Sequence, residues 1–210
     1  MNRFFLFSVL LLALALSFGA QPTIYGYSGL ITAPTAESLK MAGVALIGSS
    51  SKDLHTAGGC VGLMSNWEIS AARVSNSTSY TLLNGKITLL PEGLALPGIA
   101  VGIVDLTDEI GNSVYAVATK TIPLAKVATN TAGLPFGAPQ VSAGIASGKV
   151  LDGVFAGVVL PLSSKSRLMA EYANKKVNFG FGAQIFPLTE LEVFTLKGNL
   201  GAAVYLKLGF

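Results

Sequence analysis

The chain has 210 residues, of which 51% are hydrophobic and 12% are charged, and its formal net charge is +3. This composition argues against a disordered chain and a coiled coil, and the absence of a basic block argues against a nucleic-acid partner. One Cys argues against an internal disulfide framework, and one His makes a His-ligated metal site or a His-dependent triad a poor hypothesis.

The first twenty residues have the pattern of a secretory signal peptide. A short positive stretch precedes an apolar run from Phe4 to Phe18, and Ser17 and Gly19 supply small residues for cleavage before Ala20. Cleavage at or next to this position would remove residues 1–19 or 1–20. The apolar run of about 15 residues is short for a retained transmembrane helix, so we expect an exported protein.

The remaining chain is as apolar as a membrane protein but contains no run of 18 apolar residues. Its most apolar stretch, residues 94–104, is interrupted by Pro97 and Gly98. Only helices and closed barrels satisfy every backbone group in lipid. The sequence therefore predicts a β-barrel, with a very apolar secreted β-protein as the alternative.

Residues 21–42 are predicted to form an N-terminal segment that is separate from the barrel wall. Pro34 cannot lie in the middle of a strand ladder, and Glu37 and Lys40 are costly in lipid. We expect residues 25–41 to lie inside the barrel or against its mouth, as a possible plug. A helical turn over residues 35–42 is compatible with that placement.

Residues 43–210 are predicted to form an all-β, antiparallel transmembrane barrel of about twelve strands. Turn residues and alternation place the strands at 43–51, 54–64, 66–75, 78–90, 97–105, 112–122, 138–147, 150–160, 166–173, 176–186, 189–197 and 200–210. About 14 residues per strand and turn suits strands of about 10 residues that span a bilayer at a tilt.

The best-phased strands indicate which side chains face the lumen. Along residues 177–185, apolar residues alternate with small or polar residues, as expected for one lipid face and one inner face. The candidate lumen-lining residues are Arg167, Glu171, Asn178, Gln184, Glu190, Glu192, Tyr205 and Lys207. The many inward Gly and Ala residues leave space for an N-terminal plug.

Apolar-proline dipeptides at residues 90–91, 122–123, 160–161 and 186–187 are each spaced by about two strands. Proline belongs at strand ends, so these dipeptides are predicted to share one rim, which would be periplasmic. The longest connection, residues 124–137, falls on that rim. Barrels usually have short periplasmic turns. Either this connection folds into or across the lumen, or the predicted number of strands before residue 138 is wrong by one.

The C-terminal strand carries the pattern of an outer-membrane assembly signal. Tyr205, Leu206, Leu208 and Phe210 form it, and its partner would be the barrel-assembly machinery; an ordinary core strand is the alternative. A two-residue turn at residues 198–199 predicts that Glu190 faces Lys207 and that Glu192 faces Tyr205. In the preceding hairpin, a turn at residues 174–175 predicts the pairs Glu171–Asn178 and Leu168–Phe181.

We identify no catalytic residue, no metal ligand and no cofactor site in the sequence. His55 and Cys60 are five residues apart on one predicted strand, so they face opposite sides and are interpreted as ordinary strand residues. Glu190 and Glu192 share a face, which could suggest an acid pair. Lumen-lining carboxylates paired with Lys207 or Arg167 are the favoured interpretation.

The stretch Gly29-Leu30-Ile31-Thr32-Ala33-Pro34-Thr35-Ala36 resembles the opening motif of YjbH-type proteins, which are outer-membrane barrels associated with exopolysaccharide production. The motif residues are Gly29, Leu30, Pro34, Thr35 and Ala36, and a Gly-led strand follows at Gly43. The resemblance extends loosely over the half from residue 150. It implies a short, single-barrel member with polysaccharide or polysaccharide-export proteins as partners.

Three functions follow from these observations. The first is a part in surface or secreted polysaccharide production, which the resemblance alone implies. The second is a narrow passive pore whose selectivity is set by inward Arg and Glu residues. The third is a structural barrel that conducts nothing. All three imply contact with outer-membrane lipid.

Overall fold

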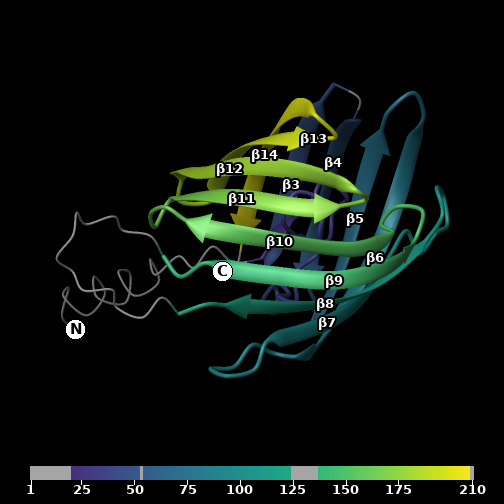
Figure 1. Ribbon diagram of the computed structural model, residues 1–210. Helices are drawn as coiled ribbons and strands as arrows, with labels where there is room; N and C mark the ends of the chain where they lie inside the picture. The colour runs from purple at the N-terminus through teal and green to yellow at the C-terminus, as the bar shows by residue number, and fades with distance from the viewer. Residues whose placement is uncertain (1–19, 53, 124–136, 209–210) are drawn as a thin grey trace, which may run out of the picture.

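The computed structural model describes residues 20–52, 54–123 and 137–208, and these ranges form a closed antiparallel barrel (Figure 1). Two short strands, β1 (Gln21–Pro22) and β2 (Ser28–Gly29), pair with each other ahead of the barrel. The barrel strands β3 to β14 are Val44–Ser51, Leu54–Gly62, Trp67–Ser75, Ser79–Leu90, Gly98–Val104, Ser113–Thr121, Gln140–Gly148, Gly153–Pro161, Ser166–Ala173, Lys176–Phe186, Thr189–Leu196 and Asn199–Leu208. Each pairs with the next, and β14 pairs with β3 to close the ring. The predicted all-β barrel of twelve strands is confirmed.

Some predictions concern residues outside these ranges. The signal peptide, residues 124–136 of the long connection and Phe210 lie there, and they stay predictions. Across the part of the chain that the structure describes, no helix has the length and apolar character needed to cross a membrane.

Side chains alternate between an inner and an outer face along the strands, because successive residues of a strand point to opposite sides. On β12, Val177, Phe179 and Phe181 are exposed, whereas the residues between them are buried. On β14, Tyr205 is fully buried and Leu206 is exposed. Large apolar side chains thus cover the outer face, and the inner face has polar and small residues together with buried large ones such as Phe155 and Phe194.

Alternate strands end at the proline dipeptides, on what we call the proline rim. β6 ends at Leu90, β8 at Thr121, β10 at Pro161 and β12 at Phe186. Since neighbouring strands are antiparallel, these ends share one rim, as predicted. β14 ends on the same rim at Leu208, and the opposite rim is called the far rim.

The hairpin between β11 and β12 has the predicted register. Glu171 lies opposite Asn178, and Leu168 lies opposite Phe181. The turn residue Asn174 has a φ of 51°, and its neighbour in the turn has a φ of 60°. Positive φ at both central residues is the geometry of a two-residue type I′ turn.

The last hairpin differs from the prediction by two residues. Its turn lies at Lys197 and Gly198, with φ angles of 53° and 88°, and not at residues 198–199. Glu190 therefore lies opposite Tyr205, and Glu192 lies opposite Ala203. A shift of two residues keeps every side chain on its predicted face, whereas a shift of one would exchange the faces.

The helical turn that the sequence allowed over residues 35–42 is not formed, since these residues contain no helix. Gly29 and Pro34 form a β-bridge instead. The backbone N–H of Ala36 donates to a barrel threonine, and that of Leu39 donates to a barrel glutamate. The barrel glutamate thus accepts the Leu39 N–H that a helix over residues 35–42 would bond internally, and the threonine accepts the Ala36 N–H that such a helix would leave without an acceptor.

Candidate functional site

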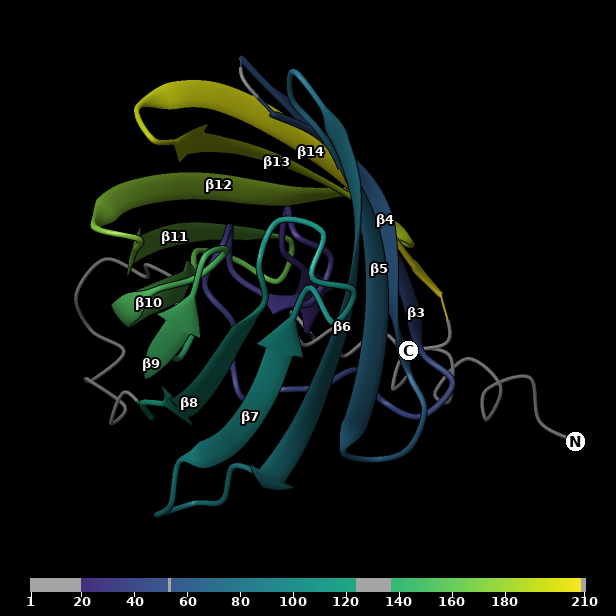
Figure 2. The same ribbon diagram turned by 90° about the vertical axis from the view of Figure 1, so that its right-hand side faces the viewer.

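The N-terminal segment, defined here as residues 20–39, lies inside the barrel (Figure 2). Its Leu30 and Ile31 side chains are at most 1% exposed. Two inward glycines make room for them. A Cβ added to Gly157 would lie 2.7 Å from Leu30 Cδ2, and one added to Gly180 would lie 3.3 Å from Ile31 Cδ1. Glycine therefore allows this close approach between the wall and the segment.

Glu171 on β11 binds the turn of the N-terminal segment. Its carboxylate accepts backbone N–H donors from Ile31 at 3.1 Å, Thr32 at 3.0 Å and Ala33 at 2.9 Å. The Thr32 hydroxyl donates at 2.5 Å, and Asn178 Nδ2 donates at 2.9 Å. Successive backbone N–H groups form a concave site for an anion, and here Glu171 supplies that anion.

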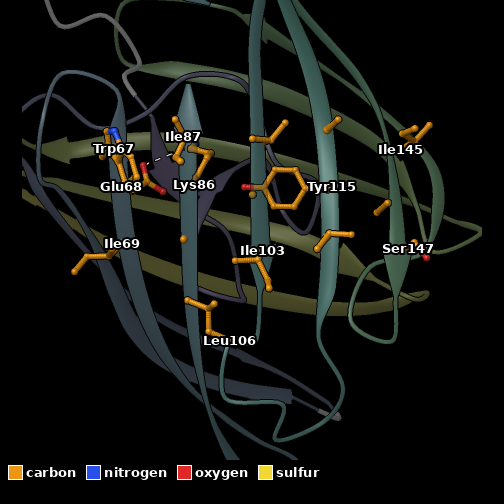
Figure 3. A pocket seen from close by; sticks show the side chains of 16 residues that line it. Trp67, Glu68, Ile69, Lys86, Ile87, Ile103, Leu106, Tyr115, Ile145 and Ser147 are labelled. Atoms are coloured by element: carbon orange, nitrogen blue, oxygen red, sulfur yellow. Dashed lines mark ion pairs between the residues drawn. The ribbon is translucent and has the colours of Figure 1, made fainter. Parts of the chain in front are cut away.

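Glu68 on β5 and Lys86 on β6 hold the same segment from another wall. Glu68 accepts the N–H of Ser28 at 2.9 Å and that of Leu39 at 3.1 Å. Lys86 Nζ lies 3.8 Å from Glu68 Oε2, the ion pair drawn as a dashed line in Figure 3. Lys86 also donates to the Ser28 side chain and to the carbonyl oxygen of Glu37. Glu68 therefore binds both ends of the stretch 28–39.

These two anchors lie on opposite walls of the barrel. The strand order runs β11, β12, β13, β14, β3, β4, β5, so β11 and β5 are six positions apart in a ring of twelve. The segment bound by Glu171 and Glu68 therefore crosses the full width of the lumen.

A third set of contacts surrounds Gln21 at the start of the segment. Arg167 forms ion pairs with Glu190 and, at 3.5 Å, with Glu192. Lys207 Nζ lies 3.1 Å from Glu190 Oε2. Gln21 donates to Glu192 Oε2 at 3.0 Å and accepts from Arg167. Arg167 and Lys207 thus face two carboxyl groups, those of Glu190 and Glu192.

Further contacts bind the segment along its length. The Tyr27 hydroxyl donates to the Thr32 carbonyl oxygen at 2.5 Å, and the Tyr27 ring centroid lies 6.0 Å from that of Tyr115. Burial raises the pKa of Tyr27 well above its usual value, so this hydroxyl keeps its proton. Nearer the proline rim, the Ser38 and Thr88 hydroxyl oxygens are 2.8 Å apart.

The candidate lumen-lining residues fall into two groups in the structure. Gln184 takes no part in the contacts above, and its Nε2 donates to the Pro187 carbonyl oxygen at the proline rim. The remaining seven are placed in the interior contacts or packed beside them: Arg167, Glu171, Asn178, Glu190, Glu192, Tyr205 and Lys207. In the assembly signal, Leu206 and Leu208 lie on the exposed outer face.

The motif residues lie within the N-terminal segment. Leu30, Pro34, Thr35 and Ala36 are buried, and Gly29 is half-buried. The Ala36 N–H donates to Thr119 Oγ1 at 2.8 Å, and the Ala36 carbonyl oxygen accepts from Thr88 Oγ1 at 2.8 Å. A Cβ added to Gly29 would lie 2.2 Å from a backbone oxygen, so the turn requires glycine there.

His55 and Cys60 lie on opposite faces of β4, as predicted, with His55 exposed and Cys60 buried. Within the three described ranges, no group of three or more His, Cys, Asp or Glu residues could hold a metal ion.

Sequence reasoning missed Glu68, Lys86 and Gln21. Glu68 lies between the exposed Trp67 and Ile69, so a single charge at an inward position of an alternating strand is the signal that could have found it. The contacts of Lys86 with residues 28–37 join parts of the chain about fifty residues apart. A local sequence pattern cannot predict contacts between residues so far apart in the chain.

Comparison with known proteins gives a likeness of fold. No family model matches the chain, and no curated protein matches it, so the resemblance to YjbH-type proteins gains no support. A solved KdgM porin matches with a TM-score of 0.50 and 8% sequence identity, over 80% of this chain and 99% of that chain. A KdgM porin in complex with disordered oligogalacturonate matches with a TM-score of 0.49 and 9% identity over the same shares. The chain thus has a porin-like barrel fold.

Proposed function

We propose that this protein is an outer-membrane β-barrel whose own N-terminal segment closes the lumen. The exposed apolar outer face supports placement in a membrane, because a soluble monomer rarely exposes apolar patches of this extent. In this placement the proline rim faces the periplasm and the far rim faces the outside. The resting protein then conducts little or nothing.

One observation carries the proposal. The stretch 28–39 is bound by Glu171 on one wall and by Glu68 on the opposite wall, so it spans the lumen. Each carboxylate accepts at least two backbone N–H groups from the segment. Hydrogen bonds to charged groups contribute about 1.5–3 kcal/mol each, although such contributions are not additive. Removal of the segment requires the loss of both anchors.

Planar-bilayer recording tests closure directly. We expect the wild-type protein to be silent and the double variant Glu68→Gln/Glu171→Gln to show frequent openings. Glu92→Gln is the matched control, because Glu92 pairs with Lys120 and Thr121 at the proline rim and, among the described residues, makes no hydrogen bond or ion pair to the segment. Stable conduction by the wild-type protein, at the level of the double variant, would refute closure.

A part in exopolysaccharide production is a finer proposal that rests on the motif resemblance alone. The motif residues contact the inside of the barrel, so any passage of a saccharide would require this segment to move. A porin-like fold is compatible with such a passage. Loss of surface polysaccharide on deletion of the gene, restored by the wild type, would support the role. An unchanged polysaccharide output would contradict the role in polysaccharide production, and the proposal of a closed barrel would be unaffected.

Membrane lipid and the barrel-assembly machinery are the partners that this proposal implies. Leu206 and Leu208 point outward on β14, which meets β3 at the closure of the ring. Replacing Phe210 with a polar residue should reduce the amount of barrel that shows heat-modifiable gel migration.

A further inference from the structure

We infer that the outer face of β3, β4 and β5 near the far rim binds one phosphate-bearing lipid of the outer leaflet. Its phosphate would lie at Arg73, and an acyl chain would lie in a groove beside Gly48. This inference rests on the proposed membrane placement but not on closure of the lumen.

The groove is a concavity of about 410 Å³ that runs over β13, β14, β3 and β4. Leu191, Val193 and Val204 are exposed apolar side chains along it, and its one charged lining residue is Glu192, which is buried and paired with Arg167. Gly48 forms part of its floor, and a Cβ added there would meet no atom within 4 Å. The lack of a side chain at Gly48 therefore leaves open space on a lipid-facing surface.

Arg73 lies next to this groove on the same face. Gly48 pairs with Ala57 across β3 and β4, and Ala57 pairs with Arg73 across β4 and β5. Two strand spacings of about 4.8 Å place the Arg73 backbone about 10 Å from Gly48. An extended arginine side chain covers much of that distance, so one amphiphile can contact both.

The position of Arg73 calls for an anionic partner. Arg73 is exposed, points to the lipid-facing side and forms no side-chain hydrogen bond or ion pair within the described ranges. A charge on that face is unfavourable unless it reaches the interface. The guanidinium group binds phosphate through two parallel hydrogen bonds, which makes a phosphorylated headgroup the matching chemistry.

The outward strand positions that the structure describes around Arg73 are polar or small. His55, two residue pairs further toward the far rim, is exposed and its Nδ1 lies 2.9 Å from Ser50 Oγ, at the edge of the groove. Lys52 is exposed in the turn that follows β3. The outward positions that the structure describes on β3 to β6 contain no Asp or Glu. The local charge therefore favours a phosphate over a neutral headgroup.

A second concavity, of about 800 Å³, lies against the outer face over β5 to β9 (Figure 3). Its charged lining residues are Glu68 and Lys86, which pair with each other and are buried. Gly85 lies in its wall, and a Cβ added there would meet its nearest atoms at 3.9 Å. This concavity offers an apolar surface without a free cation, so it provides a matched control.

Native mass spectrometry in a neutral detergent tests the site. The probe is a bis-phosphorylated, acylated glucosamine disaccharide, and its dephosphorylated counterpart is the comparison. We expect the wild-type barrel to retain one phosphorylated lipid and little of the counterpart. Arg73→Gln should weaken retention about tenfold or more, and Gly48→Leu should weaken it by filling the groove.

Two controls match these variants. Gly85→Leu fills the other concavity, and Lys165→Gln removes an exposed charge at the proline rim. Both should retain the lipid as the wild type does, and heat-modifiable migration shows that each variant is folded. Equal retention by wild type and Arg73→Gln, or equal binding of the dephosphorylated lipid, would overturn the inference. So would equal losses in Gly48→Leu and Gly85→Leu. Conduction by the wild-type protein would refute closure and leave this result unaffected.

Discussion

The two walls that hold the N-terminal segment do so by different electrostatic means. On β5 and β6, Glu68 has a cation, Lys86, at 3.8 Å. On β11, Glu171 has no ion-pair partner among the described residues, and it accepts hydrogen bonds from the segment and from Asn178. The negative charge of Glu68 is compensated by a cation of the wall. That of Glu171 is compensated by hydrogen-bond donors, chiefly the backbone N–H groups of the segment. The Glu171 contact therefore exists only when the segment is in place.

Glu171→Gln should have the largest effect. The new amide can point its NH₂ group at the N–H donors of Ile31 and Ala33, which leaves buried donors without an acceptor. Loss of charged hydrogen bonds of this kind costs about 3 kcal/mol or more. Urea unfolding in detergent micelles, with Glu92→Gln as the control, measures the cost. A loss below about 1 kcal/mol would contradict this binding of the turn.

Glu68→Gln should cost about 2 kcal/mol, and a second substitution should restore part of it. The single variant leaves Lys86 buried without its carboxylate, whereas Glu68→Gln/Lys86→Met removes both charges. A double-mutant cycle measures the coupling between the two residues. Strict additivity would show that the ion pair does not balance Glu68, and the contrast with Glu171 would disappear.

Lys207→Glu should destabilise the barrel by about 0.5–2 kcal/mol, more than Lys207→Gln, because the lost attraction and the new repulsion each contribute. The change replaces a cation 3.1 Å from Glu190 with a third carboxylate beside Glu190 and Glu192. Lys207→Gln, which removes the pair without adding a negative charge, should cost about 0.2–1 kcal/mol. The two unfolding free energies are compared at the same pH and salt. Equal unfolding free energies for Lys207→Glu and Lys207→Gln would show that the new carboxylate does not repel Glu190 and Glu192.

Glu37→Gln should have the smallest effect and a defined pH dependence. Burial raises the pKa of Glu37 above its ordinary value of 4.5, although a hydrogen bond from Gln140 opposes the shift. The folded state then binds a proton that the unfolded state has released, so stability falls as pH rises above 4.5 through the raised pKa. Glu37→Gln has no titrating group at this position, so its stability does not fall with pH for this reason. Its unfolding free energy relative to wild type should increase with pH over that window, and a decrease would contradict the direction.

Much of the wall could be predicted from sequence, because alternation and turn residues are local. Residues 177–185 reveal their two faces without any partner strand. The register of the last hairpin could not be fixed in the same way. Turns at residues 197–198 and 198–199 both contain Gly198, and both preserve the faces, so the apolar pattern does not choose between them.

The interior could be predicted only in part. The inward position of Glu171 follows from the phase of β11, but its binding of Ile31 to Ala33 joins residues about 140 apart. The turn at Gly29 to Pro34 depends on those wall contacts, since its backbone donors have their acceptors there. A helical turn after Pro34 was compatible with the local sequence, but the backbone donors of Ala36 and Leu39 bind barrel side chains instead.

A designed disulfide tests most directly whether the N-terminal segment lies in the lumen against β6. Ser38 Oγ and Thr88 Oγ1 are 2.8 Å apart, so cysteines at both positions would bring their two sulfur atoms close together. In a Cys60→Ser background, Ser38→Cys/Thr88→Cys in native membranes should yield the 38–88 cross-linked peptide after mild oxidation, and each single cysteine should label poorly from outside. Two free thiols that label efficiently from outside, with no cross-link, would contradict the placement of the segment.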